Sequence, residues 1–463
     1  MTAGHAPSPT GARVKNRFVF LDVFRAVAPV LVIYSHIVTL FLDERGLTSS
    51  VVDAINVQVR DPLRLEQNLG HIAVVMFFLV SGFVITHTGI QESHREYGIK
   101  RIFRVYPLLI FTVLLTVVLG SLDLEVLTTG QLFVLEPEYV ITNMLLVNYF
   151  QVPQVILVGV AWTLIIEIIF YGVVFLLLVV LRRRTWLAIL IELTAVLVVL
   201  LIAREFGDSF FLFAVSVSYL PVVLTGQITW AVWSGRIPLW AGGCFGAAAW
   251  LLYVFGDLRD MGRLDDAYSS TFALGFCLFL AFLLLEPRLR PAKPVSYLAD
   301  RSYSLYLLHG PIAFPILDAL GGRVPLFIAV AISVAATVAA AELTFRFVEV
   351  PGQRIARRIS RRYRLPRVQQ AGPPRHATHG SAGRLPRPHR APLRVPPVPQ
   401  PRVDRPFDDP VQGFGDNGHG QYRRAHRKLM PYQRYQPVHD NEDTTEMNKV
   451  DGVGTPRPPP HPR

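Results

Sequence analysis

Long apolar runs, most of them about twenty residues in length, follow one another along the chain and are separated by short polar stretches. A run of this length lets an α-helix cross the hydrocarbon core of a bilayer. The pattern therefore predicts an all-α fold, a polytopic integral membrane helical bundle of about ten transmembrane helices. The expected spans are residues 18–42, 70–91, 103–121, 157–181, 186–203, 208–232, 237–256, 267–285, 302–320 and 324–348.

Basic residues are distributed unevenly between the two sides that this span count defines. The segments on the side of the N-terminus hold 21 Lys and Arg, whereas the segments on the other side hold 7. Cytoplasmic loops of membrane proteins carry such an excess. The bias predicts a multi-pass protein of the cell inner or plasma membrane with both termini in the cytoplasm. The first span lacks a cleavage site typical of signal peptides, so we expect it to be retained.

Composition divides the chain into four parts. Apolar residues make up 51% of the chain and charged residues 17%, which argues against the two or three soluble domains that this length could form. We expect a cytoplasmic N-terminal segment, a membrane domain, a basic juxtamembrane segment and a Pro/Arg/His-rich cytoplasmic tail, at residues 1–17, 18–350, 351–365 and 366–463. Between the third and fourth spans, residues 139–150 are apolar but too short to cross a bilayer, so they predict a re-entrant or interfacial helix.

The tail cannot bury a core and is predicted to be disordered. Its Pro-rich runs could bind a partner as a polyproline helix, and its basic residues could contact acidic lipids. Composition alone favours a third interpretation, a tail without a selected function.

Three polar residues interrupt the first span, namely Asp22, Arg25 and His36. Charged side chains within a span usually face the protein interior and often serve function. Arg25 and His36 lie eleven residues apart, which places them on one helix face about 16 Å apart along the axis. Histidine can accept a proton from a hydroxyl near neutral pH. The pair is a candidate site in which the arginine holds an anion and the histidine performs chemistry, and a histidine satisfied within the bundle is the structural alternative.

Two further clusters lie in the third and fourth spans. Arg101 and Arg104 share a helix side, and guanidinium groups bind phosphate well, although basic residues at a membrane surface are also common without a ligand. Glu167 lies on one face with Thr163 and Tyr171. A buried carboxylate needs a partner. We consider His36 as this partner, which Glu167 would orient, and an ion pair with another basic group as the alternative.

The ninth and tenth spans carry two weaker patterns. Ser302, Tyr306 and His309 share one face, and His309 either lines a polar site or only caps the turn before Pro311. The spacing of Glu342, Arg346 and Glu349 allows pairs within one helix, so this cluster is predicted to be structural.

Together these motifs resemble the acyltransferase 3 family of membrane O-acyltransferases over roughly residues 15–365. The resemblance rests on six segments in the same order, which are LDVFRAVAPVLVIYSH, VVMFFLVSGFVI, KRIFRVYP, AWTLIIEIIFYG, RSYSLYLLHGP and FRFVEVP. It implies transfer of an acyl group, commonly acetyl in this family, from a cytoplasmic acyl-CoA such as acetyl-CoA to a hydroxyl of a carbohydrate, a glycolipid or a related acceptor.

The resemblance also implies roles for individual residues. It gives His36 the essential histidine role and matches Arg25, Arg101 and Arg104 to arginines that hold the donor phosphates. Glu167 and Trp162 match the motif of the fourth span. The histidine either takes a proton from the acceptor or carries the acyl group. We expect acyl-CoA, the acceptor and the lipid bilayer as partners, with no permanently bound cofactor, no metal and no nucleic acid.

Two other classes of function compete with this interpretation. In the first, the protein is a carrier or exporter of a lipid-linked sugar whose buried charges line a pathway. The sequence shows no convincing internal repeat, which counts mildly against a transporter. In the second, the protein is a scaffold that acts through its tail.

Overall fold

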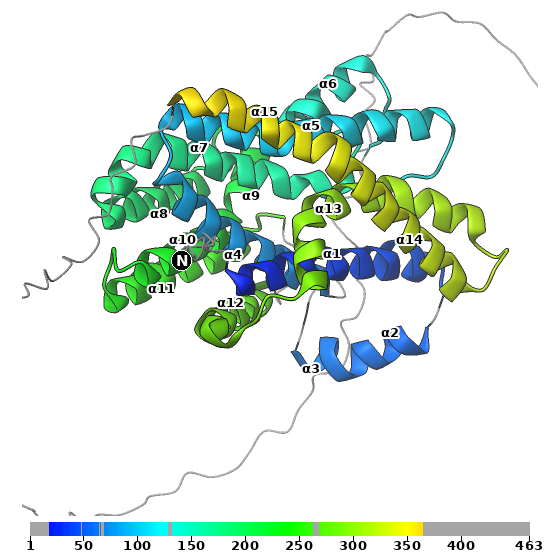
Figure 1. Cartoon of the computed structure of the whole chain (residues 1–463), viewed down its shortest axis with the longest axis horizontal. Helices are drawn as coiled ribbons and strands as arrows, with labels where there is room; N and C mark the ends of the chain where they lie inside the picture. Colours follow the sequence, from blue (N-terminus) through cyan, green and yellow to red (C-terminus); the bar gives the residue numbers. More distant parts are fainter. Residues whose placement is uncertain are drawn as a thin grey trace, which may run out of the picture. The chain divides into compact units, whose positions relative to one another are not determined.

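The computed structural model describes residues 18–363 except 48, 64, 66–68, 128–131 and 263–267. This part of the chain is helical, without a β-strand (Figure 1). The predicted tail and N-terminal segment lie outside the described residues. The α-helices are α1 Val19–Ile37, α2 Ser50–Ile55, α3 Asp61–Leu63, α4 Gly70–Gly89, α5 His94–Ser121, α6 Pro137–Leu145, α7 Trp162–Arg183, α8 Thr185–Leu201, α9 Asp208–Val217, α10 Leu220–Trp233, α11 Leu239–Leu258, α12 Tyr268–Leu285, α13 Lys293–Leu320, α14 Leu326–Thr344 and α15 Val350–Ser360.

Helices occupy all ten segments in which spans were predicted. Within the described residues, 8 helical stretches are long and apolar enough to cross a membrane, and α9 and α10 together form one of them. The other two predicted spans correspond to α8, which is shorter, and to α13, which carries more polar residues. The prediction of a polytopic helical membrane bundle is therefore confirmed.

Helix α4 lies at the centre of the bundle, where it contacts α1, α7, α10 and α12. Two glycines let α4 and α10 approach each other backbone to backbone. A β-carbon at Gly82 would lie 1.8 Å from the carbonyl oxygen of Val223, and one at Gly226 would lie 2.2 Å from that of Leu79. Small residues permit such close contact between membrane helices.

We expect Gly82→Ala to destabilise the bundle by about 3 kcal/mol, because its methyl group must displace backbone and not a flexible side chain. Thermal unfolding in detergent, followed by circular dichroism, would measure the loss. The matched control is Gly172→Ala on α7, where an added β-carbon meets nothing within 4 Å. Equal melting temperatures for the two variants would contradict this account of the packing.

Helix α1 is held at its first turn by a side chain from the far end of α12. The amides of Val19 and Phe20 donate to the two carboxylate oxygens of Glu286, at 2.9 and 2.8 Å. These amides have no partner within the helix, and a negative charge is favourable at a helix N-terminus. Glu286 therefore fixes the start of the helix that carries Arg25 and His36.

Two local features shape α1 between and after those residues. Pro29 lies within the helix and has no N–H to donate to the carbonyl group of Arg25 four residues earlier, which loosens the helix there. A π-helical segment, Val38–Asp43, begins two residues after His36. Such segments are frequent at functional sites.

The loop between α5 and α7 carries the short helix predicted at residues 139–150. It consists of α6 and a 3₁₀ turn, Val147–Phe150. Buried Asn143 ties the helix to the chain that follows, because its amide donates to the carbonyl oxygen of Val155 at 3.0 Å and its oxygen accepts from the Leu157 amide at 2.9 Å. The described part of this loop contacts α5 through α6 and contacts α13 through residues 159–161.

Candidate active site

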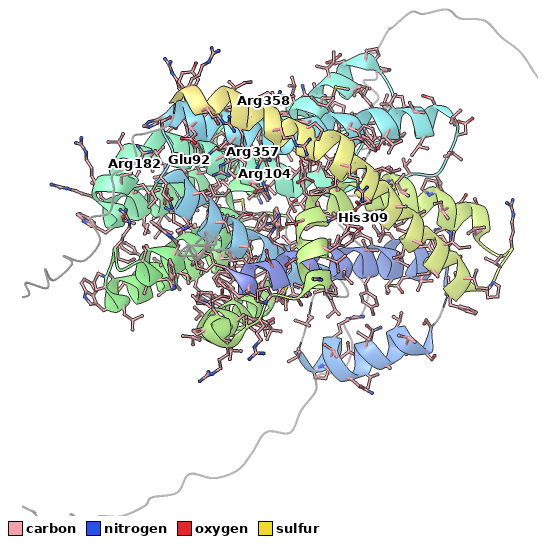
Figure 2. All side chains as sticks on the ribbon, in the orientation of Figure 1. Glu92, Arg104, Arg182, His309, Arg357 and Arg358 are labelled. Atoms are coloured by element: carbon pink, nitrogen blue, oxygen red, sulfur yellow. The ribbon has the colours of Figure 1, made fainter. Side chains whose placement is uncertain are left out.

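Two histidines from distant parts of the chain meet inside the bundle. His36 on α1 and His309 on α13 lie with Nδ1 of the first 2.8 Å from Nε2 of the second. The rings are stacked, with centroids 5.0 Å apart. His309 is 1% exposed, and Figure 2 labels it on α13 within the bundle. The face predicted for Ser302, Tyr306 and His309 thus brings a second histidine to the first.

The hydrogen bonds of the pair define which nitrogens carry protons. Nδ1 of His309 lies 2.7 Å from the carbonyl oxygen of Tyr306, and a carbonyl oxygen can only accept, so this nitrogen donates. In neutral His309 the other nitrogen, Nε2, is then an acceptor. Nδ1 of His36 must donate to it. Nε2 of His36 is left with a free lone pair and is the basic atom of the pair.

Tyr306 is held in place by hydrogen bonds of its hydroxyl group and by packing of its ring. Its hydroxyl donates to the carbonyl oxygen of Val160 at 2.8 Å and accepts from Thr163 at 2.9 Å. Its ring lies parallel to that of Phe77, with an interplanar angle of 5°. A chain of contacts therefore runs from α7 through Tyr306 to the histidine pair.

An arginine-lined cavity of about 30 Å³ lies next to this chain of contacts. Arg25 and Arg104 contribute its cationic groups, and apolar side chains form much of the rest of the wall. The lining residues are Phe24, Arg25, Ala28, Pro29, Val32, Ala73, Val74, Phe77, Val80, Arg104, Thr163, Ser302, Tyr303 and Tyr306.

This cavity corrects one expectation drawn from the helix spacing. Arg25 and His36 were predicted to lie on one helix face and to form one site, but on α1 the lining of the cavity ends at Val32, one helical turn before His36. Tyr306 and Phe77 line the cavity with parallel rings, and the ring of Tyr306 also contacts that of His309. The arginine end and the histidine end of the site are thus two compartments in contact.

The carboxylate of Glu167 is buried, but it does not contact His36, the partner considered for it in the sequence. It accepts hydrogen bonds from Ser81 at 3.2 Å and from Tyr171 at 2.5 Å. His36 pairs with His309 instead, so the hypothesis that Glu167 orients His36 does not match the contacts. Glu167 lies one helical turn after Thr163, which lines the cavity. Glu167 therefore belongs to the arginine compartment.

Glu349 is a residue of this compartment that sequence reasoning assigned to a structural helix pair. Glu342 does form such pairs, with Arg346 and also with Arg301. Glu349 instead turns inward, is 4% exposed and accepts from Ser304 at 3.0 Å. Ser304 directly follows Tyr303, which lines the cavity. The sequence could have indicated this buried position, because Glu349 lies next to an apolar segment and a charged residue within a membrane is energetically unfavourable without a partner.

The two arginines of the third predicted span have different surroundings. Arg104 lines the cavity, and Figure 2 labels it on α5. Arg101 donates to Thr88 at 2.7 Å, pairs with Glu92 at 3.4 Å and lies over the ring of Tyr97. Arg101 thus fastens α5 to the end of α4. The two residues are predicted to act alike, but only Arg104 lines the cavity.

The remaining predicted residues lie around these two compartments. Ser302 lines the cavity and donates to the carbonyl oxygen of Ala299 at 3.0 Å. Trp162 lies at the start of α7, where its ring contacts Phe78 and Tyr219. Across the described ranges, no three His, Cys, Asp or Glu side chains gather as metal ligands do.

Fold and site together define a multi-pass membrane protein with a basic histidine and a cationic cavity in its interior. A family model described as an acyltransferase domain matches residues 18–345, which is most of the chain. The protein belongs to the acyltransferase 3 family and is a membrane acyltransferase, as its six motifs predicted. Comparison with curated proteins and with solved structures finds no match.

Proposed function

We propose that the protein is an O-acyltransferase that moves an acyl group, most simply acetyl, from a cytoplasmic acyl-CoA to a hydroxyl of a carbohydrate or related acceptor. The observation that carries this proposal is the hydrogen-bonded chain from the Tyr306 carbonyl group through His309 to His36. This chain leaves Nε2 of His36 unprotonated and fixes its direction. A base oriented in this way by a second group is what acyl transfer to a hydroxyl requires.

His36 acts as the general base in the proposed reaction. Its Nε2 takes the proton of the acceptor hydroxyl while the oxygen forms a bond to the thioester carbonyl carbon. The carbon–sulfur bond then breaks, and the CoA thiolate takes the proton back from His36. In a second route, Nε2 attacks the thioester carbonyl carbon and the carbon–sulfur bond breaks to release the CoA thiolate. The acyl group then passes from Nε2 to the acceptor oxygen, and the hydroxyl proton goes to the thiolate. The same lone pair serves both routes.

Arg25 and Arg104 are proposed to bind the phosphates of the donor. Both line the cavity, and Glu167 and Glu349 are buried carboxylates near its wall. The axial distance of about 16 Å from Arg25 to His36 suits an extended pantetheine arm. The cavity has space for only about two water molecules. Donor binding therefore requires side chains such as Phe77 and Tyr306 to move.

Reconstituted full-length protein supplied with radiolabelled acetyl-CoA tests this proposal. We expect release of free CoA that depends on an added glycan or glycolipid acceptor, with label appearing on that acceptor. Longer acyl-CoA donors in parallel reactions would define the acyl group. Movement of a lipid-linked sugar without consumption of thioester would instead favour the carrier.

His309 gives a separate prediction within this mechanism. We expect His309→Ala to lower kcat about 100-fold, because His36 loses the acceptor that fixes its tautomer. His309→Gln should recover part of the loss, since an amide oxygen can accept the same proton. The KM for acyl-CoA should not change, because the arginines are untouched. Steady-state kinetics measure both constants, and equal losses in the two variants would count against a role in setting the tautomer.

A further inference from the structure

Helix α15 packs against α5 through three small residues spaced one turn apart. Gly352, Ala356 and Ser360 are buried, and a β-carbon at Gly352 would lie 3.3 Å from Cγ of Pro107 on α5. Figure 1 shows α15 lying along α5, and the contacts between the two helices agree. One face of α15 is thus closed by protein.

The opposite face of α15 and of the turn that follows it is basic and exposed. It carries five arginines, and residues 350–363 contain no Asp or Glu. The arginines are Arg354, Arg357, Arg358, Arg361 and Arg362, all exposed; Figure 2 labels Arg357 and Arg358 on this helix. None of the five lines the arginine cavity.

An apolar strip borders this basic face. Ile355 and Ile359, one turn apart, are 46% and 42% exposed. Helices with exposed apolar residues beside a basic arc are typical of the membrane–water interface, where the apolar part meets acyl chains and the cations meet headgroups.

The position of α15 in the bundle is consistent with such an interface. Tyr363, just after α15, lies under the guanidinium group of Arg95, at the start of α5. Nearby, Arg182 at the end of α7 donates to backbone carbonyl oxygens of Gly89 and Ile90 in the turn before α5. Exposed Trp186 follows at the start of α8. Tryptophan and arginine together mark the headgroup level of a bilayer.

We propose that the arginine face of α15 is a binding site for anionic phospholipids. The lipid phosphates would pair with the guanidinium groups, and the acyl chains would lie against Ile355 and Ile359. Positive charge on a helix that contains no acidic residue, together with an apolar edge, matches a lipid better than a soluble anion, which has no apolar part.

Titration of the full-length protein with phosphatidylglycerol and with phosphatidylcholine, followed by native mass spectrometry, tests the site. The test variant is Arg358→Gln with Arg362→Gln, two neighbouring positions on the arginine face. Each arginine near the surface contributes about fivefold to binding of an anionic lipid, so we expect about 25-fold weaker binding of phosphatidylglycerol. Binding of phosphatidylcholine should not change.

The matched control variant is Arg183→Gln with Arg184→Gln, which removes two exposed arginines at the end of α7. We expect it to weaken phosphatidylglycerol binding less than the test variant does, because it leaves the five arginines and the apolar strip of α15 intact. Equal losses in the two variants would reduce the site to general surface charge and overturn the proposal. Displacement of phosphatidylglycerol from the wild type by free coenzyme A would also overturn it, because the arginines would then bind the nucleotide. Elution of both variants at the wild-type volume in size-exclusion chromatography excludes misfolding as the cause.

Discussion

Replacement of His36 by alanine is expected to lower acyl transfer at least about 1,000-fold. The variant loses the only nitrogen that the hydrogen-bonded chain from Tyr306 through His309 leaves free to accept a proton. Either chemical route, direct transfer or an acyl-histidine, uses this atom, so both predict the same loss. Transfer of label from radiolabelled acetyl-CoA to an acceptor measures it.

The control for this prediction must separate chemistry from folding. His36→Ala should still insert into the membrane and elute from size-exclusion chromatography like the wild type, because the buried core around α1 is mainly apolar. His94→Ala, at the start of α5, removes a histidine whose ring contacts Phe175 outside the site, and it should keep nearly full activity. Full activity in the His36 variant would disprove the proposed mechanism.

Replacement of Arg104 by glutamine is expected to raise the KM for acyl-CoA about 30-fold with little change in kcat. A hydrogen bond between charged groups contributes about 2 kcal/mol, and a group that binds substrate and transition state equally affects KM alone. Arg104→Lys keeps a positive charge beside Glu167 and Glu349 but loses the guanidinium fork, so its KM should rise less. Initial rates at varied acyl-CoA concentration give both constants.

Arg101→Gln provides the matched comparison on the same helix. Its guanidinium group holds Thr88 and Glu92, so we expect a lower melting temperature and a KM close to that of the wild type. The family motif contains both arginines, but in the structure Arg104 lines the cavity, whereas Arg101 contacts Thr88 and Glu92. A larger rise in KM for the Arg101 variant than for the Arg104 variant would contradict this assignment.

Much of the fold could be predicted from the sequence because membrane helices depend on a local property. Twenty apolar residues form a spanning helix wherever they occur in a chain, and all ten predicted segments are helical. Helix ends were less certain: α5 begins at His94, nine residues before the predicted start of its span. Its first turns are polar, and hydropathy gives no reason to extend a span into polar residues. The N-cap at Ser93, whose hydroxyl accepts from the Glu96 amide, fixes that start.

The site could be predicted as a set of residues but not as a set of pairs. Polar groups within apolar runs identified Arg25, His36 and Glu167, because such groups are costly in a membrane. Which of them meet depends on how helices far apart in the chain pack together. His36 pairs with His309, 273 residues away, and no local spacing encodes this contact. Helical periodicity likewise placed Glu349 beside its own helix neighbours, whereas packing turns it toward the arginines.

The carboxylate that closes the first turn of α1 has a consequence for biogenesis. Glu286 follows Val19 by 267 residues, so nearly two thirds of the protein must be synthesised before the two amides receive their acceptor. Until α12 has entered the bilayer, water or lipid headgroups must solvate the beginning of α1. Assembly of the proposed site is thereby coupled to a late stage of translation. A chain that ends before α12 would have a first helix in the membrane whose first turn lacks the Glu286 carboxylate.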